Sequence, residues 1–354
     1  MIPRRQFIGS LAALAAGSVG HVRAGEWSNT ESRQLDWEYE LIEPLPNTTS
    51  SRRPVVTGVS LQAKGDLLAI VGDDHFVSIY DTEKRVFNEP LREHTDWIRA
   101  VKFSPDGKLL ATAGNDHKLC LWDSNRLGTP IFSARNPGAI IDLTFSPDGN
   151  QIATVGFESK LRIFDVARGK QMMELDCPSA DNHAVAYSAD GESIAVGGRN
   201  GVIRCWTLAD GRLIFDEKIH RQRVRSLEFT KDGHLLSVSD DQMIKITDMR
   251  EPDRSTQLER QSSKLFSAAI LGPDLLATGG SDNKINIWNL KLAAPHHVGY
   301  LNQHTGTVSC LEYKNSKLVS GSFDTFVILW NAKQQENGPL QRQTQKNGWN
   351  RILN

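Results

Sequence analysis

Short apolar stretches alternate with polar turn residues along most of the chain, with almost none of the 3.6-residue periodicity of a helix. In residues 98–103, Ile-Arg-Ala-Val-Lys-Phe, polar side chains separate the apolar ones as in a strand with one better-buried face. Residues 104–107, Ser-Pro-Asp-Gly, have tight-turn chemistry, because Pro fixes φ and Gly tolerates a positive φ. Further strand-like runs follow at 109–112 and 118–122, and a weaker one near 130–132. The pattern predicts a unit of four short strands.

This unit recurs along the chain. The ten residues from Phe103 to Thr112 return almost unchanged at 145–154, and shorter copies begin at Tyr187 and Phe229. Each unit ends in a residue pair in the register of Trp-Asp, and the second members of these pairs are residues 81, 123, 165, 207, 248, 289 and 331. The spacing is therefore always 41 or 42 residues. Seven units with a constant period predict a repeat architecture.

These repeats resemble those of the WD40 family, whose units of about 40–45 residues have four strands and end in Trp-Asp. The resemblance covers residues 37–331. It implies an all-β fold, a seven-bladed β-propeller with four-stranded antiparallel blades. One blade cannot bury its two apolar faces alone, whereas blades stacked radially protect one another.

In this family one blade is usually assembled from both chain ends, which closes the ring. Residues 37–45 alternate bulky and acidic side chains like an outer edge strand, and their β propensity exceeds that of the C-terminal segment. We therefore assign them to the last blade. Residues 25–36 are expected to be a linker, and residues 332–354 a polar tail rich in Gln and Asn.

The first 24 residues have the three-part pattern of a cleavable signal peptide: a basic start, an uncharged run and a small-residue end. Arg4-Arg5 before Gln-Phe-Ile resembles the bacterial twin-arginine export signal, and cleavage after Ala24 would leave a mature chain that starts at Gly25. This removal takes away three arginines and lowers the formal charge from −1 to −4. We expect a periplasmic or cell-envelope protein without a membrane span. The general export route and a cytosolic protein with an accidental Arg-Arg tail are the alternatives.

The resemblance also implies a buried polar network in each complete blade: a His before the inner strand, a Ser or Thr on the second strand, an Asp in the next turn and the terminal Trp. Such groups must satisfy one another, because an unpaired buried polar group costs about 1–3 kcal/mol. The matching residues are His94, Thr112, Asp116 and Trp122 in the second blade, His220, Ser237 and Asp241 in the fifth, Thr278, Asp282 and Trp288 in the sixth, and His304, Ser320, Asp324 and Trp330 in the last. Their register favours a structural role over a metal or catalytic site.

Blades one, three and four lack the upstream His, and their turn position holds Asp74, Glu158 and Asn200. We expect these blades to depend more on apolar packing. The sequence contains no nucleophile elbow, zinc-binding His-Glu-x-x-His or phosphate-binding Gly-rich loop, and no convergent set of acidic residues at the strand starts. We therefore predict no catalytic residue, no metal and no cofactor. The four cysteines, Cys120, Cys177, Cys205 and Cys310, are expected to be unpaired and buried as small hydrophobes.

In WD40 proteins the partner-contacting positions flank the first apolar residue of each inner strand or precede the turn Asp. The positions of this chain that match are Trp97, Arg99, Phe157, His183, Arg199, Arg223, Arg225, Asp240, Lys264, Phe266 and Phe323. Five cations and several aromatic residues on one face of an acidic protein are an uneven distribution. Arg and Trp often anchor interfaces, and Arg binds carboxylates in a bidentate manner. The pattern favours an acidic-aromatic peptide or protein segment as the ligand, against ordinary solvated loop charges.

The sequence as a whole predicts a monomeric, exported, non-catalytic scaffold that binds a protein or peptide partner through one propeller face. Balanced charge, with 41 Lys and Arg against 42 Asp and Glu, argues against a nucleic-acid partner. The alternative is an exported propeller enzyme, similar to a lactonase or hydrolase, with its site at the mouth of the central channel.

Overall fold

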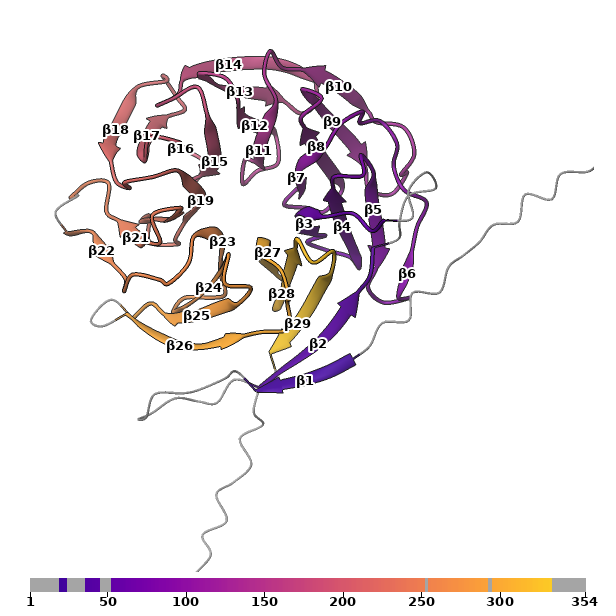
Figure 1. Cartoon of the computed structure of the whole chain (residues 1–354). Helices are drawn as coiled ribbons and strands as arrows, with labels where there is room; N and C mark the ends of the chain where they lie inside the picture. The colour runs from indigo at the N-terminus through magenta and orange to yellow at the C-terminus, as the bar shows by residue number, and fades with distance from the viewer. Residues whose placement is uncertain (1–18, 24–35, 45–51, 252–253, 292–294, 333–354) are drawn as a thin grey trace, which may run out of the picture.

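The computed structural model describes residues 19–23, 36–44, 52–251, 254–291 and 295–332. Within them the regular elements are strands, and they form seven sheets arranged as a ring (Figure 1). The predicted all-β, seven-bladed propeller with four-stranded antiparallel blades is confirmed. Most of the predicted signal peptide (1–24) and linker (25–36), and all but the first residue of the predicted tail (332–354), lie outside the described residues.

The first six blades follow one another along the chain. The strands of blades one to three are β3 (Val56–Leu61), β4 (Leu67–Gly72), β5 (Val77–Asp81), β6 (Val86–Phe87), β7 (Ile98–Phe103), β8 (Leu109–Gly114), β9 (Lys118–Asp123), β10 (Phe132–Arg135), β11 (Ile140–Phe145), β12 (Gln151–Gly156), β13 (Lys160–Asp165) and β14 (Lys170–Asp176). The strands of blades four to six are β15 (Asn182–Tyr187), β16 (Ser193–Gly198), β17 (Val202–Thr207), β18 (Leu213–Lys218), β19 (Val224–Phe229), β20 (Leu235–Ser239), β21 (Ile244–Thr247), β22 (Thr256–Gln257), β23 (Leu265–Ile270), β24 (Leu275–Gly280), β25 (Ile285–Asn289) and β26 (His296–Leu301). The first strand of each blade faces the centre of the ring (Figure 1).

Blade seven combines the two ends of the described chain. Its strands are β27 (Val308–Lys314), β28 (Lys317–Ser322), β29 (Val327–Ala332), β2 (Asp36–Ile42) and β1 (Val19–Arg23). β2 pairs antiparallel with β29, so ring closure by the N-terminal strand is confirmed. The expectation that this segment forms the outer edge is wrong, because β1 pairs with β2 as a fifth strand. β1 belongs to the segment predicted as a signal peptide.

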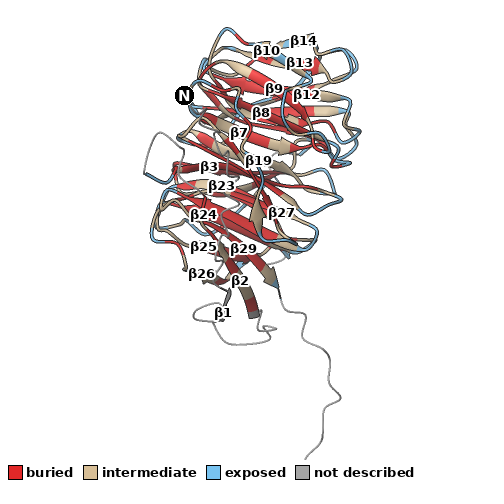
Figure 2. Cartoon of the chain, turned by 90° about the vertical axis from the view of Figure 1, so that its right-hand side faces the viewer, coloured by how far each residue is buried: buried red, intermediate tan, exposed pale blue. Residues whose placement is uncertain are grey.

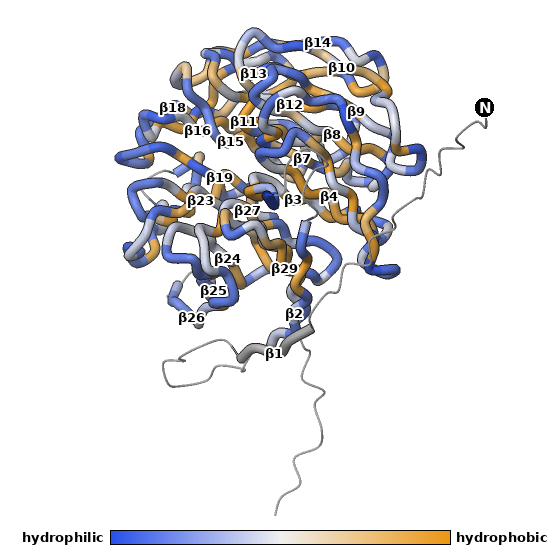
Figure 3. Tube along the Cα trace, turned by 45° about the vertical axis from the view of Figure 1, so that its right-hand side comes forward, coloured by the Kyte–Doolittle hydropathy of each residue, from blue (hydrophilic) through white to orange (hydrophobic). Residues whose placement is uncertain are grey.

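The core lies between neighbouring blades rather than within one blade. One cluster, for example, joins Ala111 and Leu121 of blade two to Leu143 and Phe164 of blade three. Buried residues follow the inner three strands, whereas outer strands such as β14 are largely exposed (Figure 2). The hydropathy of the chain follows the same division, with apolar inner strands and polar loops (Figure 3). The predicted tight turn after β7 is present, since Gly107 has φ +76°.

Every inner strand carries an irregularity at the same place. The register between the first and second strands shifts at the second residue in all seven blades, which leaves that residue unpaired as in a β-bulge. Such bulges redirect a side chain. In this ring they determine which residues surround the centre.

Candidate functional site

The seven bulge residues all line one cavity of about 570 Å³ in the centre of the ring. They are Thr57, Arg99, Ile141, His183, Arg225, Phe266 and Ser309. Two exposed side chains from the turns between second and third strands, Phe157 and Phe323, also line it. We call these nine residues the channel mouth. Four of the seven bulge residues were predicted from the repeat register, and Thr57, Ile141 and Ser309 were not.

Arg225 of blade five is stacked on an aromatic ring of blade six, which in turn contacts a ring of blade seven. The guanidinium of Arg225 donates to both carboxylate oxygens of Asp240, at 2.8 and 3.1 Å. It also lies 4.8 Å from the ring centre of Phe266, which is in edge contact with Phe323. This geometry is a cation–π contact reinforced by a bidentate ion pair. Arg225 is therefore held in one orientation at the edge of the cavity.

Blade four places a second acidic group in this region. Asp181 precedes β15 at the position equivalent to Trp97 and Arg223, and its Oδ2 accepts from Arg223 Nη2 at 2.8 Å. Its Oδ1 lies 2.7 Å from His183 Nε2. Burial, together with the charge of Arg225, lowers the pKa of His183 to about 4. His183 is therefore neutral at physiological pH.

Asp181 Oδ1 and His183 Nε2 are within contact distance of each other, whereas the buried Arg223 Nε lacks a hydrogen-bond partner among the described residues. An unsatisfied buried polar atom of this kind costs about 1–3 kcal/mol. A ligand that supplies the missing partner recovers part of this cost. The cluster thus has unused capacity for hydrogen bonding next to the channel mouth.

Blade two carries the other stacked arginine. Arg99 Nε donates to Asn115 Oδ1 at 2.9 Å, and its guanidinium lies 4.7 Å from the ring centre of Trp97. Trp97 is 39% exposed, and Phe157 of blade three is 50% exposed and in edge contact with His183. Large apolar side chains that remain exposed beside a cavity are typical of interaction sites.

Most residues of the predicted binding face lie together in the structure, but the face has less free positive charge than predicted. Six predicted residues line the cavity, namely Arg99, Phe157, His183, Arg225, Phe266 and Phe323. Trp97, Arg223 and Asp240 contact the cavity residues or their partners, whereas Arg199 and Lys264 are exposed, with Arg199 Nη1 3.8 Å from Asp181 Oδ2. The excess of free cations is smaller than predicted, because Asp181 and Asp240 neutralise Arg223 and Arg225.

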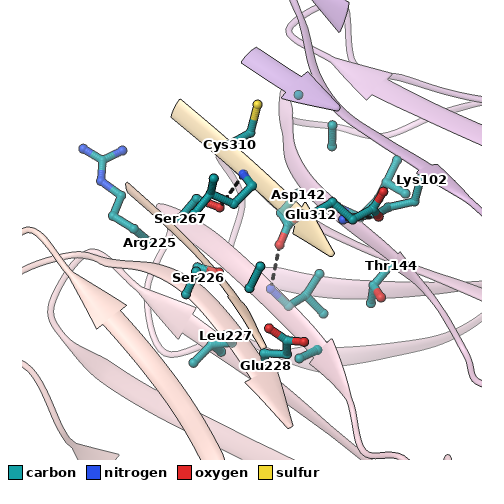
Figure 4. Close-up of a pocket in the computed structure, with 18 of the residues that line it drawn as sticks. Lys102, Asp142, Thr144, Arg225, Ser226, Leu227, Glu228, Ser267, Cys310 and Glu312 are labelled. Carbon is teal, nitrogen blue, oxygen red and sulfur yellow. Dashed lines mark hydrogen bonds and ion pairs between the residues drawn. The ribbon is translucent and has the colours of Figure 1, made fainter. Parts of the chain in front are cut away.

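Deeper in the channel lies a polar set that the sequence analysis missed. Figure 4 shows Lys102, Asp142, Glu228 and Glu312 around the cavity, to which Lys314 also contributes. The prediction of no convergent acidic residues applies only to the strand starts, whereas these carboxyl groups and Lys102 come from the third residue of β11 and from the fifth residues of β7, β19 and β27. Burial raises the pKa of Asp142 to about 6 and that of Glu228 to about 7. Burial acts in the same direction on Glu312, but the charges of Lys102 and Lys314 outweigh it and its pKa is lowered.

Each of these carboxyl groups also joins two neighbouring blades. Asp142 Oδ2 accepts from Val185 N at 2.9 Å, and Glu228 Oε2 accepts from Ile270 N at 3.0 Å. Glu312 of blade seven accepts from the backbone N–H of Leu61 in blade one and from Lys102 Nζ in blade two. The charged lining of the channel is therefore part of what holds the ring together.

The predicted buried network is present in blades two, five and seven. In blade two, Asp116 lies 3.0 Å from His94 Nδ1, His94 Nε2 lies 2.9 Å from Thr112 Oγ1, and Trp122 Nε1 donates to the same hydroxyl at 3.0 Å. The equivalent bonds are made by His220, Ser237 and Asp241, and by His304, Ser320, Asp324 and Trp330. These His and Asp residues satisfy one another.

Two blades differ from the prediction. In blade three, Asn136 takes the position of the His and donates to Thr154 Oγ1 at 3.0 Å and to Glu158 Oε1 at 3.4 Å, so this blade does not depend on apolar packing alone. In blade six, Trp288 donates to Thr278, but Asp282 binds only its own turn and Asn286. The amide of Asn136 donates to two residues of the network, although its Oδ1 is buried without a partner among the described residues, whereas Gln261 donates to Glu259 O.

The other side chains considered for chemistry are the cysteines and the metal-ligating residues. All four cysteines are unpaired as predicted, and burial raises the pKa of each to about 11 or 12, which keeps the thiols protonated. Cys310 is only half-buried, because it lies beside the channel. No group of three or more metal-ligating side chains is found in the described part of the chain. The same residues include no helix long and apolar enough to cross a membrane.

Comparison with known proteins agrees with this architecture. The family model described as the IFT122 first beta-propeller matches residues 55–298, and that of the WD domain, G-beta repeat, matches residues 296–331. A p21-activated protein kinase-interacting protein 1-like from Xenopus laevis is 29% identical over 35% of this chain and 27% of its own length. A guanine nucleotide-binding protein subunit beta from Dictyostelium discoideum is 31% identical over 34% of this chain and 35% of its own length.

These alignments cover only about a third of either curated relative. The family match, in contrast, spans most of the ring and agrees with the blade register, the buried His-Asp networks and the closure by β2. The chain belongs to the WD40-repeat β-propeller family and matches its IFT122-type propeller.

Proposed function

We propose that this protein is an exported, non-catalytic scaffold that binds a protein or peptide segment at the channel mouth. The observation that carries the proposal is the exposure of Phe157 and Phe323, 50% and 46%, beside a cavity of about 570 Å³. In protein interfaces a few residues contribute most of the binding energy, and aromatic residues and arginines are common among them. Propeller relatives such as a kinase-interacting protein and a G-protein subunit support a role in protein interaction.

The mouth favours a segment that combines an apolar or aromatic side chain with a carboxylate. Phe157 and Phe323 offer apolar contact, and the Nη groups of Arg99 form no hydrogen bond with a described residue. Arg225 is already paired with Asp240 through two of its five N–H bonds, so it contributes its stacked face and the three remaining N–H bonds.

A pair of variants tests the binding face. Phe157→Ser/Phe323→Ser removes the exposed aromatic rings without touching an ion pair, and Met172→Ser removes a rim residue of comparable exposure, 54%. In affinity capture from an envelope fraction, the double variant is expected to lose the partner that wild type and Met172→Ser retain. Circular dichroism establishes that all three proteins are folded. Equal capture by all three would exclude the channel mouth as the site.

Export is supported by the basic start, uncharged run and Val22-x-Ala24 end of the first 24 residues. Arg4 and Arg5 favour the twin-arginine route, which transports folded proteins and suits a chain with unpaired thiols. In that case the protein acts in the periplasm or cell envelope of a bacterium. Replacing both arginines by lysine is expected to leave the precursor in the cytosol, and unchanged export would point to the general route.

The second candidate function is hydrolysis inside the channel. Asp142 and Glu228 favour it, because carboxyl groups with pKa values near 6 and 7 are suited to general acid–base work at neutral pH. Purified protein would be incubated with lactone and ester panels, with and without Ca²⁺ or Zn²⁺, beside Asp142→Asn and Glu228→Gln. Turnover by wild type that both variants lose would replace the scaffold proposal.

A further inference from the structure

Blades three, four and five share a cation at the same position of the third strand. The residues are Arg162 on β13, Arg204 on β17 and Lys245 on β21, and each is directly opposite a residue of the outer strand. Directly opposed residues on neighbouring strands interact through their side chains. The three blades therefore allow a comparison of one cationic position with three different partners.

In blades three and four the opposing residue is acidic. Arg162 forms ion pairs with Glu174 on β14 and with Glu158, at 2.5 and 2.9 Å. Arg204 donates to Asp216 on β18 at 2.9 Å. The positive charge is neutralised within the blade in both cases.

In blade five the opposing residue is Gln257, which carries no charge. Lys245 Nζ donates to the carbonyl of Ile219 at 2.6 Å, and it forms no ion pair with a described residue. Asp241 lines the same cavity as Lys245, but His220 Nδ1 and the backbone N–H groups of Arg221 and Met243 occupy its two oxygens. Lys245 therefore lacks the acidic partner that its equivalents have.

A cavity of about 440 Å³ lies at this position, and two further cations line it. These are Arg221, from the loop before β19, and Arg260, which follows β22. Arg260 Nε donates to Gln242 Oε1 at 2.9 Å and leaves its terminal N–H groups available, and neither arginine forms an ion pair with a described residue. β22 contains only two residues, so the outer strand covers less of this blade than the seven residues of β14 cover in blade three.

We propose that Arg221, Lys245 and Arg260 form a binding site for an oxyanionic group, a carboxylate or a phosphate. The ligand's anion takes the place that Glu174 and Asp216 occupy in the neighbouring blades. Arginine presents paired donors that match the oxygens of both anions, and Lys245 adds a point charge. This site shares no lining residue with the channel cavity, so it is independent of the proposed partner face.

The most informative variant is Gln257→Glu, because it gives blade five the internal counter-charge of blades three and four. It is expected to fold at least as well as wild type, since it adds an ion pair to Lys245, and to raise the Kd for an anion at least ~10-fold. Lys245→Gln, which removes the charge instead, is expected to weaken binding by a similar factor. Asn125→Asp is the matched control, because it adds the same charge at an exposed turn of blade two.

Binding is measured by isothermal titration calorimetry and by the ligand-dependent rise in Tm of the full chain, at constant ionic strength. Inorganic phosphate and glutarate are the two probes, and chloride is the reference. Saturable binding of phosphate alone would assign a phosphate ligand, and saturable binding of glutarate alone a carboxylate. Either result, lost in Gln257→Glu and kept in Asn125→Asp, supports the site. No saturable binding of either probe, or equal binding by wild type and Gln257→Glu, would overturn it.

Discussion

Replacement of Asp116 by Ala tests whether the His-Asp constellations are structural. The two oxygens of Asp116 accept from His94 Nδ1 at 3.0 Å and from the backbone N–H groups of Thr95 and Lys118 at 3.1 Å. The side chains of His94 and Asp116 are 0% and 1% exposed, so water cannot replace the lost partner of the imidazole. An unsatisfied buried donor costs about 1–3 kcal/mol, and the two backbone groups add to it. We expect Asp116→Ala to lower the free energy of unfolding by about 3–5 kcal/mol.

Blade six offers the matched control. Asp282 has the same position in its turn, but Gln261 stands where the His would be, and Asp282 accepts only from Lys284 N and Asn286 Nδ2, at 3.2 and 3.3 Å. Asp282→Ala is therefore expected to cost about 1 kcal/mol.

Both variants are measured by urea unfolding, followed by tryptophan fluorescence and by circular dichroism to test for coincident transitions. Equal midpoint shifts for the two variants would refute the network argument. So would an Asp116→Ala protein that keeps its stability but loses partner binding.

Three further predictions concern pH and processing. Burial raises the pKa of Glu228 to about 7, so the folded protein binds more protons than the unfolded chain and its stability falls as the pH rises from about 4 to 7. Glu228→Gln is expected to reduce the dependence of the urea midpoint on pH over this range. An unchanged dependence would contradict the assignment. Burial acts to raise the pKa of Asp324, but the hydrogen bond from His304 outweighs burial and lowers this pKa to about 2. The stability that Asp324 contributes is therefore lost as the pH falls from about 4 to 2. Asp324→Asn is expected to make acid unfolding less steep. Mass spectrometry of the protein recovered from the periplasm is expected to find Gly25 at the N-terminus, and an intact Met1 on an exclusively cytosolic protein would exclude export.

The sequence predicted the fold because its repeat register is strict. A spacing of 41 or 42 residues correctly predicts the inner strands, the turns and the buried networks of blades two, five and seven. The same register located Arg99, His183, Arg225 and Phe266 at the channel mouth, since position in the repeat determines which residue the bulge exposes.

The misses have physical causes. Asp181 lies in the same register as Trp97 and Arg223, but a search for cations and aromatic residues passes over an acid that neutralises them. Asn136 replaces a His because an amide can also bond to a hydroxyl and a carboxylate, which a rule based on residue type does not anticipate. Asp142, Glu228 and Glu312 read as ordinary polar residues of alternating strands, because only the closed ring directs their side chains into one channel.

The central claim is that the channel mouth binds a protein segment, and site-specific photo-cross-linking tests it most directly. A photoreactive phenylalanine analogue is placed at Phe323 of the channel mouth and, as a control, at Met172 on the outer strand β14, and each protein is irradiated in intact cells. We predict a discrete adduct with one partner from position 323 and none from position 172. Adducts from position 172 alone, or the same adducts from both positions, would contradict the proposed site.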